Sequence, residues 1–258
     1  MLIDTHCHLN DDRFRDDLDE VLRRAEAAGV AAVVVPGVDV ASSERAIALA
    51  ERYPQVFAAV GIHPEALDRV TERDFAAIAA LADHPKVVAI GEVGLDYYWN
   101  VAPPEVQQEA FRRQMVLARE KRLPVIVHNR DATEDTVRLI EEMRHPDTFG
   151  VMHCFTENIE IARRCIAAGF YISYAGPVTF KNADRVRATA AQVPLVRMVV
   201  ETDAPYLTPH PFRGRRNEPG HVRLVAERLA DVRGLALADL AHTLTDNARR
   251  LFPRLTLP

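Results

Sequence analysis

The chain has 258 residues, of which 48% are hydrophobic, and this is enough apolar material to bury a substantial core. Its formal net charge of −5 at pH 7 argues against the broad basic surface with which proteins bind long duplex nucleic acid. Three cysteines without CxxC spacing argue against a disulfide framework, and without a signal-peptide pattern or a long apolar run the sequence predicts a soluble cytoplasmic protein that does not enter a membrane.

Short apolar runs rich in β-branched residues recur along the whole chain and alternate with stretches of helical spacing. The predicted strands are residues 2–8, 31–36, 56–63, 87–94, 124–128, 150–153, 170–174 and 198–203. The predicted helices between them are residues 13–28, 42–52, 71–82, 105–122, 132–144, 159–168 and 183–191, and two more follow at 221–232 and 237–252. This alternation favours an α/β fold: one (β/α)8 TIM barrel spanning 1–258 as a single domain, with extra C-terminal helices, rather than a doubly wound sheet.

Residues at the helix ends agree with this division of the chain. Gly29 and Gly169 follow predicted helices, where a left-handed residue commonly ends a helix. Ser42 and Thr71 stand at the expected N-cap positions.

Side chains that can bind a metal ion stand at the carboxyl ends of several predicted strands. They are His6, His8, Glu92, His128, His153 and Asp203. Because the carboxyl ends of barrel strands meet at one mouth, we expect these side chains to converge there. The two-residue period of a strand also places His6 and His8 on one face and leaves Cys7 on the other.

This residue set predicts a site for two divalent metal ions. Any one such histidine or aspartate is usually an ordinary core or rim residue, but ligands on five strands at one end are difficult to attribute to packing. Six ligands exceed the needs of one tetrahedral ion, whereas two ions about 3.5–4 Å apart, bridged by a carboxylate, would use them all. The candidate cofactors are Zn²⁺, Mg²⁺ and Mn²⁺.

Seven segments together resemble the TatD family of metal-dependent deoxyribonucleases, within the amidohydrolase-like barrels. They are IDTHCHL at 3–9, GIHP at 61–64, GEVGLDY at 91–97, PVIVH at 124–128, HCF at 153–155, ETDAPYL at 201–207 and NARRLF at 247–252. The resemblance implies that His6, His8, Glu92 and Asp203 bind one ion, while Glu92, His128 and His153 bind the other. It also implies a nuclease, often a 3′→5′ exonuclease on single-stranded DNA or RNA with links to DNA repair.

These expectations assign catalytic roles to three residues. In this hypothesis Glu92 bridges the two ions, and Asp203 accepts a proton from the water that attacks phosphorus. His63 ends the third predicted strand, where its imidazolium could contact a phosphate or the leaving oxygen, or could simply cap the loop. Glu201 lies on the same strand face as Asp203, one layer deeper, and favours a hydrogen bond to a ligand over direct ligation.

Substrate contacts are expected around the mouth. Asp96 could orient a ligand or water, or cap a turn, and Tyr206 could line the mouth or pack against it. Arg213 belongs to a basic cluster with Arg215 and Arg216 that could bind a nucleic-acid backbone or remain solvated. The aromatic segment 97–99 could stack on a base or cover the rim. The expected partner is a nucleic acid, mainly its single-stranded ends, with no obligate protein partner indicated.

Two other functions remain open from the sequence. A two-metal hydrolase of esters or amides, such as a deacylase acting on D-aminoacyl-tRNA, would use the same ligands. A non-enzymatic barrel that binds metal or nucleic acid is the second alternative, although a purely structural metal site needs no open coordination position.

Overall fold

The computed structural model describes residues 1–257 and places eight parallel strands in one sheet, in the order of the chain. The strands are β1 (Leu2–Asp4), β2 (Val30–Pro36), β3 (Val56–Val60), β4 (Val87–Asp96), β5 (Val125–Arg130), β6 (Gly150–Met152), β7 (Phe170–Tyr174) and β8 (Met198–Val200). Each strand pairs with the next in parallel register. This sequential order confirms the predicted barrel and excludes a doubly wound sheet.

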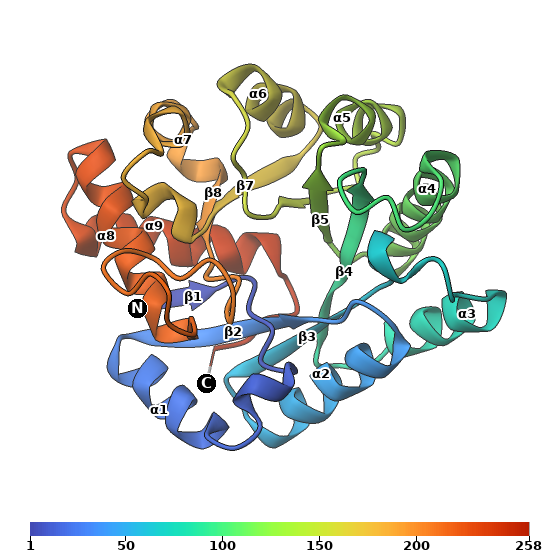
Figure 1. Ribbon diagram of the computed structural model, residues 1–258, viewed down its shortest axis with the longest axis horizontal. Coiled ribbons are helices and arrows are strands. Elements are labelled where there is room, and N and C mark those ends of the chain that lie inside the picture. Colours follow the sequence, from blue (N-terminus) through green and yellow to red (C-terminus); the bar gives the residue numbers. More distant parts are fainter. Residues whose placement is uncertain (258) are drawn as a thin grey trace.

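Helices connect the strands and surround them on the outside (Figure 1). They are α1 (Leu18–Ala27), α2 (Val40–Arg52), α3 (Glu72–Leu81), α4 (Pro104–Lys121), α5 (Thr133–Glu142), α6 (Ile159–Ala167), α7 (Asp184–Ala190), α8 (Val222–Arg233) and α9 (Leu237–Leu251). Short 3₁₀ turns stand at Asp12–Phe14, Pro64–Ala66, Gly176–Thr179, Leu195–Arg197 and Pro219–His221. No helix within residues 1–257 is long and apolar enough to span a membrane.

The barrel closes between β8 and β1 through individual backbone hydrogen bonds rather than a full ladder. These bonds run from Thr5 N to Val200 O (3.1 Å), from Asp203 N to His6 O (2.9 Å) and from His8 N to Ala204 O (2.7 Å). Closure therefore takes place in the segments just beyond the two strands. It brings residues near the start of the chain beside residues about 200 positions later.

Several strands end before the polar residues that the sequence assigned to them. β1 ends at Asp4, β3 at Val60 and β8 at Val200, so His6, His63 and Asp203 lie on the loops that follow. Their side chains nevertheless lie close together at the mouth, around Glu92. One helix cap also differs from the prediction. The N-cap of α2 is Asp39 rather than Ser42, and the backbone N of Ser42 donates a hydrogen bond to the Asp39 carboxylate (2.7 Å).

The other predicted helix ends are confirmed. Thr71 is the N-cap of α3 and forms a capping box with Asp74. Gly29 and Gly169 follow α1 and α6 with φ of 88° and 99°, in the left-handed region that glycine adopts without steric cost.

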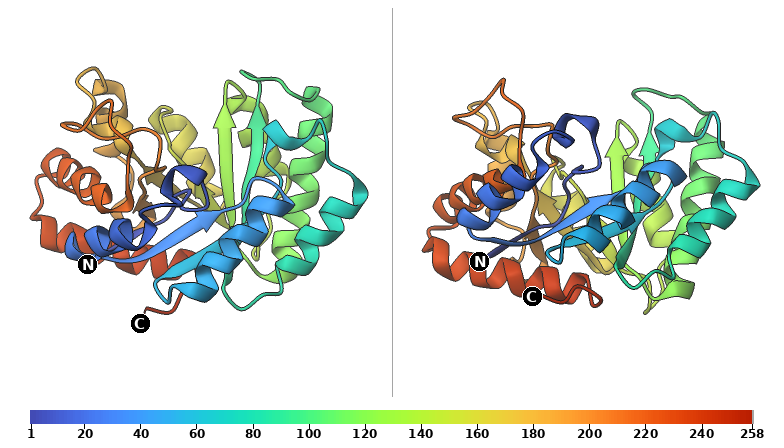
Figure 2. Two further views of the ribbon diagram at one scale, coloured as in Figure 1. Left: turned by 60° about the horizontal axis from the view of Figure 1, so that its bottom comes forward. Right: turned by 90° about the horizontal axis from the view of Figure 1, so that it is seen from below.

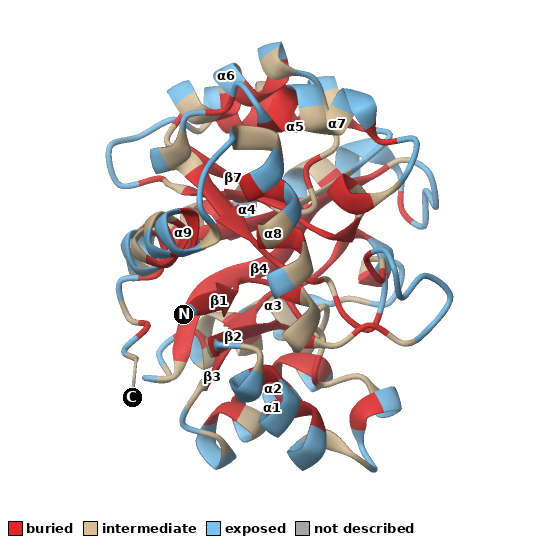
Figure 3. Cartoon of the chain, turned by 90° about the vertical axis from the view of Figure 1, so that its left-hand side faces the viewer, coloured by how far each residue is buried: buried red, intermediate tan, exposed pale blue. Residues whose placement is uncertain are grey.

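Apolar side chains pack on both sides of the closed sheet, one layer between the strands and the helices and the other inside the barrel. The strands are buried on both faces, whereas the helices expose one side (Figure 3). Inside the barrel the strands contribute Ile3, Ala32, Val34, Phe57, Ala59, Val88, Ala89, Ile126, Val151, Tyr171 and Val199. At the amino-terminal end of the strands, α9 and the chain after it cover this interior with Leu251, Phe252 and Leu255 (Figure 2). The opposite end remains available for polar chemistry.

We predict that Asn247 is important for attaching α9 to the barrel. Its buried amide donates to Leu195 O (2.6 Å) and Met198 O (2.8 Å), beside the start of β8. Asn247→Ala should lower the free energy of unfolding by about 1–3 kcal/mol, measured by urea denaturation, because one buried and one partly buried carbonyl group lose a donor. Thr243→Ala on the exposed side of α9 is the control, expected to change it by less than about 0.5 kcal/mol. Equal stability of the two variants would contradict this attachment.

Candidate metal centre

Two of the expected ligand segments meet where the barrel closes. His6 and His8 follow β1, Asp203 follows β8, and the closing hydrogen bonds place these segments side by side. Cys7 lies on the opposite side, fully buried, and forms an isolated parallel bridge with Ala204. The backbone of Asp203 is left-handed, with φ of 57°, a conformation that Asp and Asn tolerate better than most residues. The expected alternation of His6, Cys7 and His8 is therefore present although β1 itself ends earlier.

Glu92 enters the mouth from an irregularity in β4. The register between β4 and β5 shifts between Ile90 and Val93, and Glu92 N donates to Gly37 O (2.8 Å). Such a bulge redirects the side chain. Gly94, with φ of 145°, then pairs with His128, and an added Cβ at Gly94 would lie 2.0 Å from His128 O. Only glycine permits this approach of the two strands.

Four side chains converge on one point beside the Oε2 atom of Glu92. His6 Nε2 lies 3.2 Å from Glu92 Oε2 and 3.6 Å from Asp203 Oδ1. His8 Nε2 lies 3.6 Å from Glu92 Oε2 and 3.5 Å from Asp203 Oδ1, and the two imidazole nitrogens are 3.1 Å apart. A tetrahedral ion with bonds of about 2.0–2.2 Å separates its ligands by roughly 3.3–3.6 Å. This donor set therefore fits one divalent cation.

Three further imidazoles surround the other oxygen of Glu92. Oε1 lies 2.9 Å from His128 Nδ1, 3.2 Å from His153 Nε2 and 3.5 Å from His63 Nε2. The carboxylate thus stands between two groups of nitrogen donors. This is the position that a bridging ligand requires, and His128 and His153 are suited to a second ion.

Carboxylates outside the cluster orient two of its imidazoles. His128 Nε2 is 2.9 Å from Asp96 Oδ2, and His153 Nδ1 is 3.0 Å from Glu201 Oε1. Glu201 Oε2 also accepts a hydrogen bond from Ser173 Oγ (2.7 Å). A carboxylate on the far nitrogen fixes the ring and makes a metal-binding imidazole more basic. The hydrogen bond anticipated for Glu201 is therefore present.

Asp96 combines the two roles that the sequence left as alternatives, whereas for His63 the structure shows the cap and the contact with substrate stays a prediction. His63 Nδ1 accepts a hydrogen bond from Glu65 N (3.1 Å) and so caps the 3₁₀ turn, while its Nε2 faces Glu92. Asp96 Oδ1 accepts from Trp99 N (2.9 Å), while Oδ2 contacts His128. Because the Nδ1 lone pair of His63 is occupied, a neutral His63 carries its proton on Nε2 and is suited to donate rather than to bind a metal.

The charges of the cluster shift the pKa values of its members. Burial alone would raise the pKa of Glu92, but the nearby imidazoles of His153, His6 and His63 outweigh it and lower the pKa well below its usual range. Burial, with repulsion from His128, lowers the pKa of His63 to about 4. This lowered pKa favours a neutral His63 at pH 7, with an Nε2–H donor, over the imidazolium suggested by the sequence.

A buried hydrogen-bond network behind the cluster was not anticipated. Asp4, fully buried, accepts from His6 N (3.3 Å), Thr202 N (2.9 Å) and Thr202 Oγ1 (2.5 Å). Asn217 Nδ2 donates to Thr202 O (2.9 Å) and Tyr206 O (2.7 Å). These bonds fix the two ligand segments to each other. The available signal was a carboxylate inside an otherwise apolar run, since a buried carboxylate needs partners.

The cluster lies at the base of a cleft of about 720 Å³. His8, His63 and Tyr206 line it, and Tyr206 is 47% exposed. Three arginines that no pattern in the sequence indicated also line it: Arg45 from α2, Arg69 from the connection between β3 and α3, and Arg130 from the end of β5. No spacing rule links these positions in the sequence.

Arg213 and its neighbours lie outside the lining of this cleft. The Arg213 guanidinium stacks on the Phe180 ring, with Cζ 3.9 Å from its centroid, and donates to Thr208 O (3.0 Å). Arg216 pairs with Asp17 (2.6 Å). These contacts stabilise the loop after β8, so at least part of the expected basic cluster is engaged by the protein itself.

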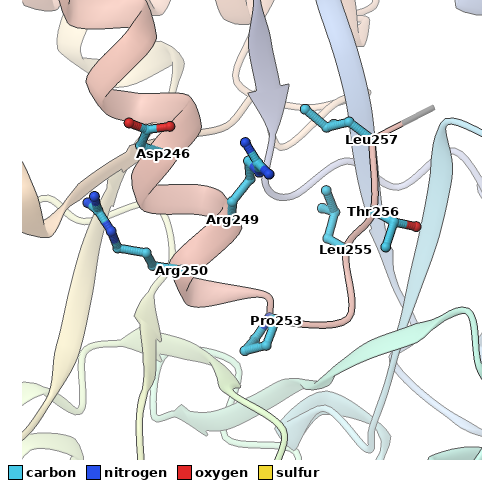
Figure 4. Close-up of a pocket in the computed structure, with 7 residues that line it drawn as sticks. All are labelled: Asp246, Arg249, Arg250, Pro253, Leu255, Thr256 and Leu257. Carbon is cyan, nitrogen blue, oxygen red and sulfur yellow. The ribbon is translucent and has the colours of Figure 1, made fainter.

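A second hollow of about 690 Å³ lies at the end of α9 and the chain that follows it (Figure 4). Asp246, Arg249 and Arg250 are its charged residues, and neither histidine nor cysteine is among the described residues that line it. It therefore lacks the donor set of a metal centre of the kind found at the mouth.

The fold and the site together define a class of protein: a parallel (β/α)8 barrel that carries a candidate metal centre of histidines and carboxylates at its mouth. Comparison with known proteins gives the family: residues 3–253 match the model of the TatD related DNase family, and the chain belongs to that family. A Bacillus subtilis relative named "Uncharacterized metal-dependent hydrolase YabD" is 49% identical and covers 98% of this chain and 99% of its own.

Two further proteins extend this comparison. The "3'-5' ssDNA/RNA exonuclease TatD" of Escherichia fergusonii is 36% identical, over 97% of this chain and 98% of its own. The crystal structure of the Escherichia coli TatD homologue YJJV superposes with a TM-score of 0.93, at 32% identity and 98% coverage of both chains. The resemblance noted in the sequence is thereby confirmed at the level of family and fold.

Metal ions should stabilise the folded protein. Because the ligands converge only in the folded state, saturating Zn²⁺ or Mn²⁺ should raise the Tm of chelator-treated protein by roughly 5–15 °C. Metal content is measured in parallel by elemental analysis. His8→Ala should remove most of this shift, whereas His242→Ala, which removes an exposed imidazole on α9, should keep it. An identical shift in both variants would place the bound metal elsewhere.

The contact between Glu201 and His153 should set the affinity for metal. Glu201→Ala should weaken binding roughly 10–100-fold, measured by competition with a chromophoric chelator, because His153 loses the group that orients it. Glu201→Gln keeps an acceptor for His153 Nδ1–H and should lose less. If the Ala variant binds metal as tightly as the wild type, the orienting role is wrong.

Proposed function

We propose that this protein is a divalent-metal-dependent phosphodiester hydrolase that removes nucleotides from the 3′ ends of single-stranded DNA or RNA. The observation that carries the proposal is the placement of Glu92, whose two oxygens each face a separate group of imidazoles. The name of the Escherichia fergusonii relative supports the nuclease activity, and the relatives named metal-dependent hydrolases support the use of metal.

The ligand assignment follows from the two groups. His6, His8, Glu92 and Asp203 would hold one ion, and Glu92, His128 and His153 would hold the other. When bound, a pair of Zn²⁺, Mg²⁺ or Mn²⁺ ions supplies an activated water and neutralises charge on the phosphoryl oxygens.

Asp203 is suited to accept the proton of the attacking water. Its carboxylate lines the cleft and is 13% exposed, so water can reach it. Burial raises its pKa, but the hydrogen bond from His8 and the nearby imidazoles outweigh burial and lower the pKa below its usual value. Asp203 is therefore ionised at neutral pH, as an acceptor must be.

His63 is suited to donate a hydrogen bond at the leaving oxygen. It lines the same cleft, its ring is neutral, and the cap on Nδ1 leaves the proton on Nε2. The donor thus lies on the β3 side of Glu92, across the cleft from Asp203 on the β8 side, an arrangement compatible with in-line displacement.

The surface around the cleft favours a strand end over a duplex. Of the cations that line it, neither Arg45 nor Arg130 forms an ion pair within residues 1–257, so both are available to phosphate. The net charge of −5 leaves the rest of the surface without the positive field that long duplexes need. Recognition should therefore be local and should weaken steeply with salt.

Release of mononucleotides from end-labelled single-stranded DNA tests this function. Metal-loaded protein should trim DNA labelled at either end from its 3′ side, and Asp203→Asn should lower kcat roughly 10²–10⁴-fold because the proton acceptor is lost. Asn tolerates the left-handed backbone at this position.

The metal content of each variant is to be measured before its activity is compared. Asp246→Asn, at the other end of the barrel, is the matched control. Wild-type turnover by Asp203→Asn would refute the acceptor role. If the loaded protein cuts neither DNA nor RNA in any of the three metals, the nuclease proposal is wrong, and esters and aminoacyl-tRNA become the substrates to assay.

A further inference from the structure

Two large aromatic side chains stand exposed beside the cleft. Tyr98 is 55% exposed and Trp99 is 56% exposed, and Trp99 lines the cleft together with His128 and Arg130. Large apolar surface in water is unfavourable, and where it borders a polar cleft it commonly marks a binding surface. The neighbouring Tyr97, by contrast, is half-buried.

The aromatic pair has a guanidinium stacked on it. The rings of Tyr98 and Trp99 meet edge to face, with centroids 5.0 Å apart. Arg130 Cζ lies 3.9 Å from the centroid of Tyr98 and 5.5 Å from that of Trp99. We refer to these three residues as the aromatic platform. An arginine held flat against a ring loses less freedom when it binds an anion.

Arg130 differs from Arg13 and Arg113, two other arginines that lie over aromatic rings, because no carboxylate of the described residues pairs with it. Arg13 stacks on Tyr206 across the cleft but is paired with Asp11 at 2.8 Å. Arg113 stacks on Phe75 and is paired with Glu72 at 2.8 Å. Within residues 1–257 Arg130 forms no ion pair. The platform therefore offers an unneutralised cation beside an exposed ring face.

Short covalent and hydrogen-bonded paths connect the platform to the candidate metal centre. Trp99 N donates to Asp96 Oδ1 (2.9 Å), and the other oxygen of Asp96 contacts His128 Nε2 (2.9 Å). Arg130 follows His128 by two residues in β5, and its carbonyl accepts from Tyr97 N (2.9 Å). The platform is thus held at a fixed separation from the cluster.

We propose that Tyr98, Trp99 and Arg130 form a nucleobase subsite, in which an unpaired base stacks on the exposed aromatic surface while Arg130 binds the adjacent phosphate. This inference rests on the proposed nuclease function and specifies how its substrate is bound. Stacking accepts any base, because every base has a π face, and it requires that the base is not held in a duplex. The subsite therefore selects single-stranded ends with little sequence preference.

Tryptophan fluorescence, excited at a wavelength that tyrosine does not absorb, reports on this subsite alone because Trp99 is the one tryptophan of the protein. Metal-loaded protein is titrated with thymidine 5′-monophosphate, deoxyadenosine 5′-monophosphate and 2-deoxyribose 5-phosphate, which share the phosphate and differ in the base. Both nucleotides should quench Trp99 saturably. The base-free sugar phosphate should not quench, and calorimetry should find it roughly 5–150-fold weaker in binding.

Variants separate stacking from a structural role. Arg130→Ala should weaken the binding of nucleotides measured by quenching, whereas Arg52→Ala, which removes a similar arginine–ring contact on Tyr53 away from the cleft, is the matched control and should not. In kinetics, Trp99→Ala should raise KM for oligonucleotides, so that their kcat/KM relative to that of base-free methyl p-nitrophenyl phosphate falls roughly 5–150-fold. If Trp99 had only a structural role, Trp99→Ala would lower kcat/KM for both substrates by the same factor.

The outcomes distinguish the two proposals. If the protein cuts DNA but nucleotides leave Trp99 fluorescence unchanged, or if Trp99→Ala leaves that kcat/KM ratio as in the wild type, the subsite is refuted and the nuclease function stands. If nucleotides quench Trp99 and the sugar phosphate does not, but the protein cuts neither DNA nor RNA, the nuclease function is refuted and the subsite for nucleobases stands.

Discussion

Closure of the barrel between β8 and β1 is the constraint on which the candidate site depends. A sheet of parallel strands has two edges, and here they meet through a few backbone hydrogen bonds in the segments just beyond the strands. Those same segments hold His6, His8 and Asp203. The buried carboxylate of Asp4 joins the two segments through Thr202, so the fold and the ligand geometry share one set of contacts. A substitution that broke these hydrogen bonds between the segments after β8 and β1 would also separate His6 and His8 from Asp203.

The cluster places many ionisable groups in a small, largely buried volume, which is costly unless each finds a partner. Glu92 reduces this cost because each of its oxygens faces imidazole nitrogens. Asp96 and Glu201 extend the network outward to His128 and His153. A divalent cation on either side of Glu92 would be bound by the same nitrogen and oxygen atoms that now face one another. The protein therefore keeps a polar interior in the arrangement that a metal needs.

Much of the fold and of the ligand set was predictable, because both leave periodic signals. Alternating apolar runs and helical stretches predicted the barrel, and polar residues at the carboxyl ends of these runs predicted which side chains meet. The rest depends on contacts between distant positions. The hydrogen bonds that Thr202 donates to Asp4, and the position of Arg45 beside the cleft, have no local pattern in the sequence. Arg213 was expected either to bind a nucleic-acid backbone or to remain solvated; its guanidinium lies over Phe180 and outside the cleft lining, a contact between distant positions that no local pattern indicates.

The cover that α9 forms over the amino-terminal end of the barrel gives the two ends of the molecule different roles. Leu251, Phe252 and Leu255 complete the apolar interior at one end, while the loops that surround the cleft at the other contribute little to it. Substitutions in those loops can therefore accumulate without a large loss of packing energy. Related barrels can diverge in substrate choice while retaining one scaffold, and libraries intended to redirect this protein to new substrates should vary the loops after β3 and β4 and leave α9 intact.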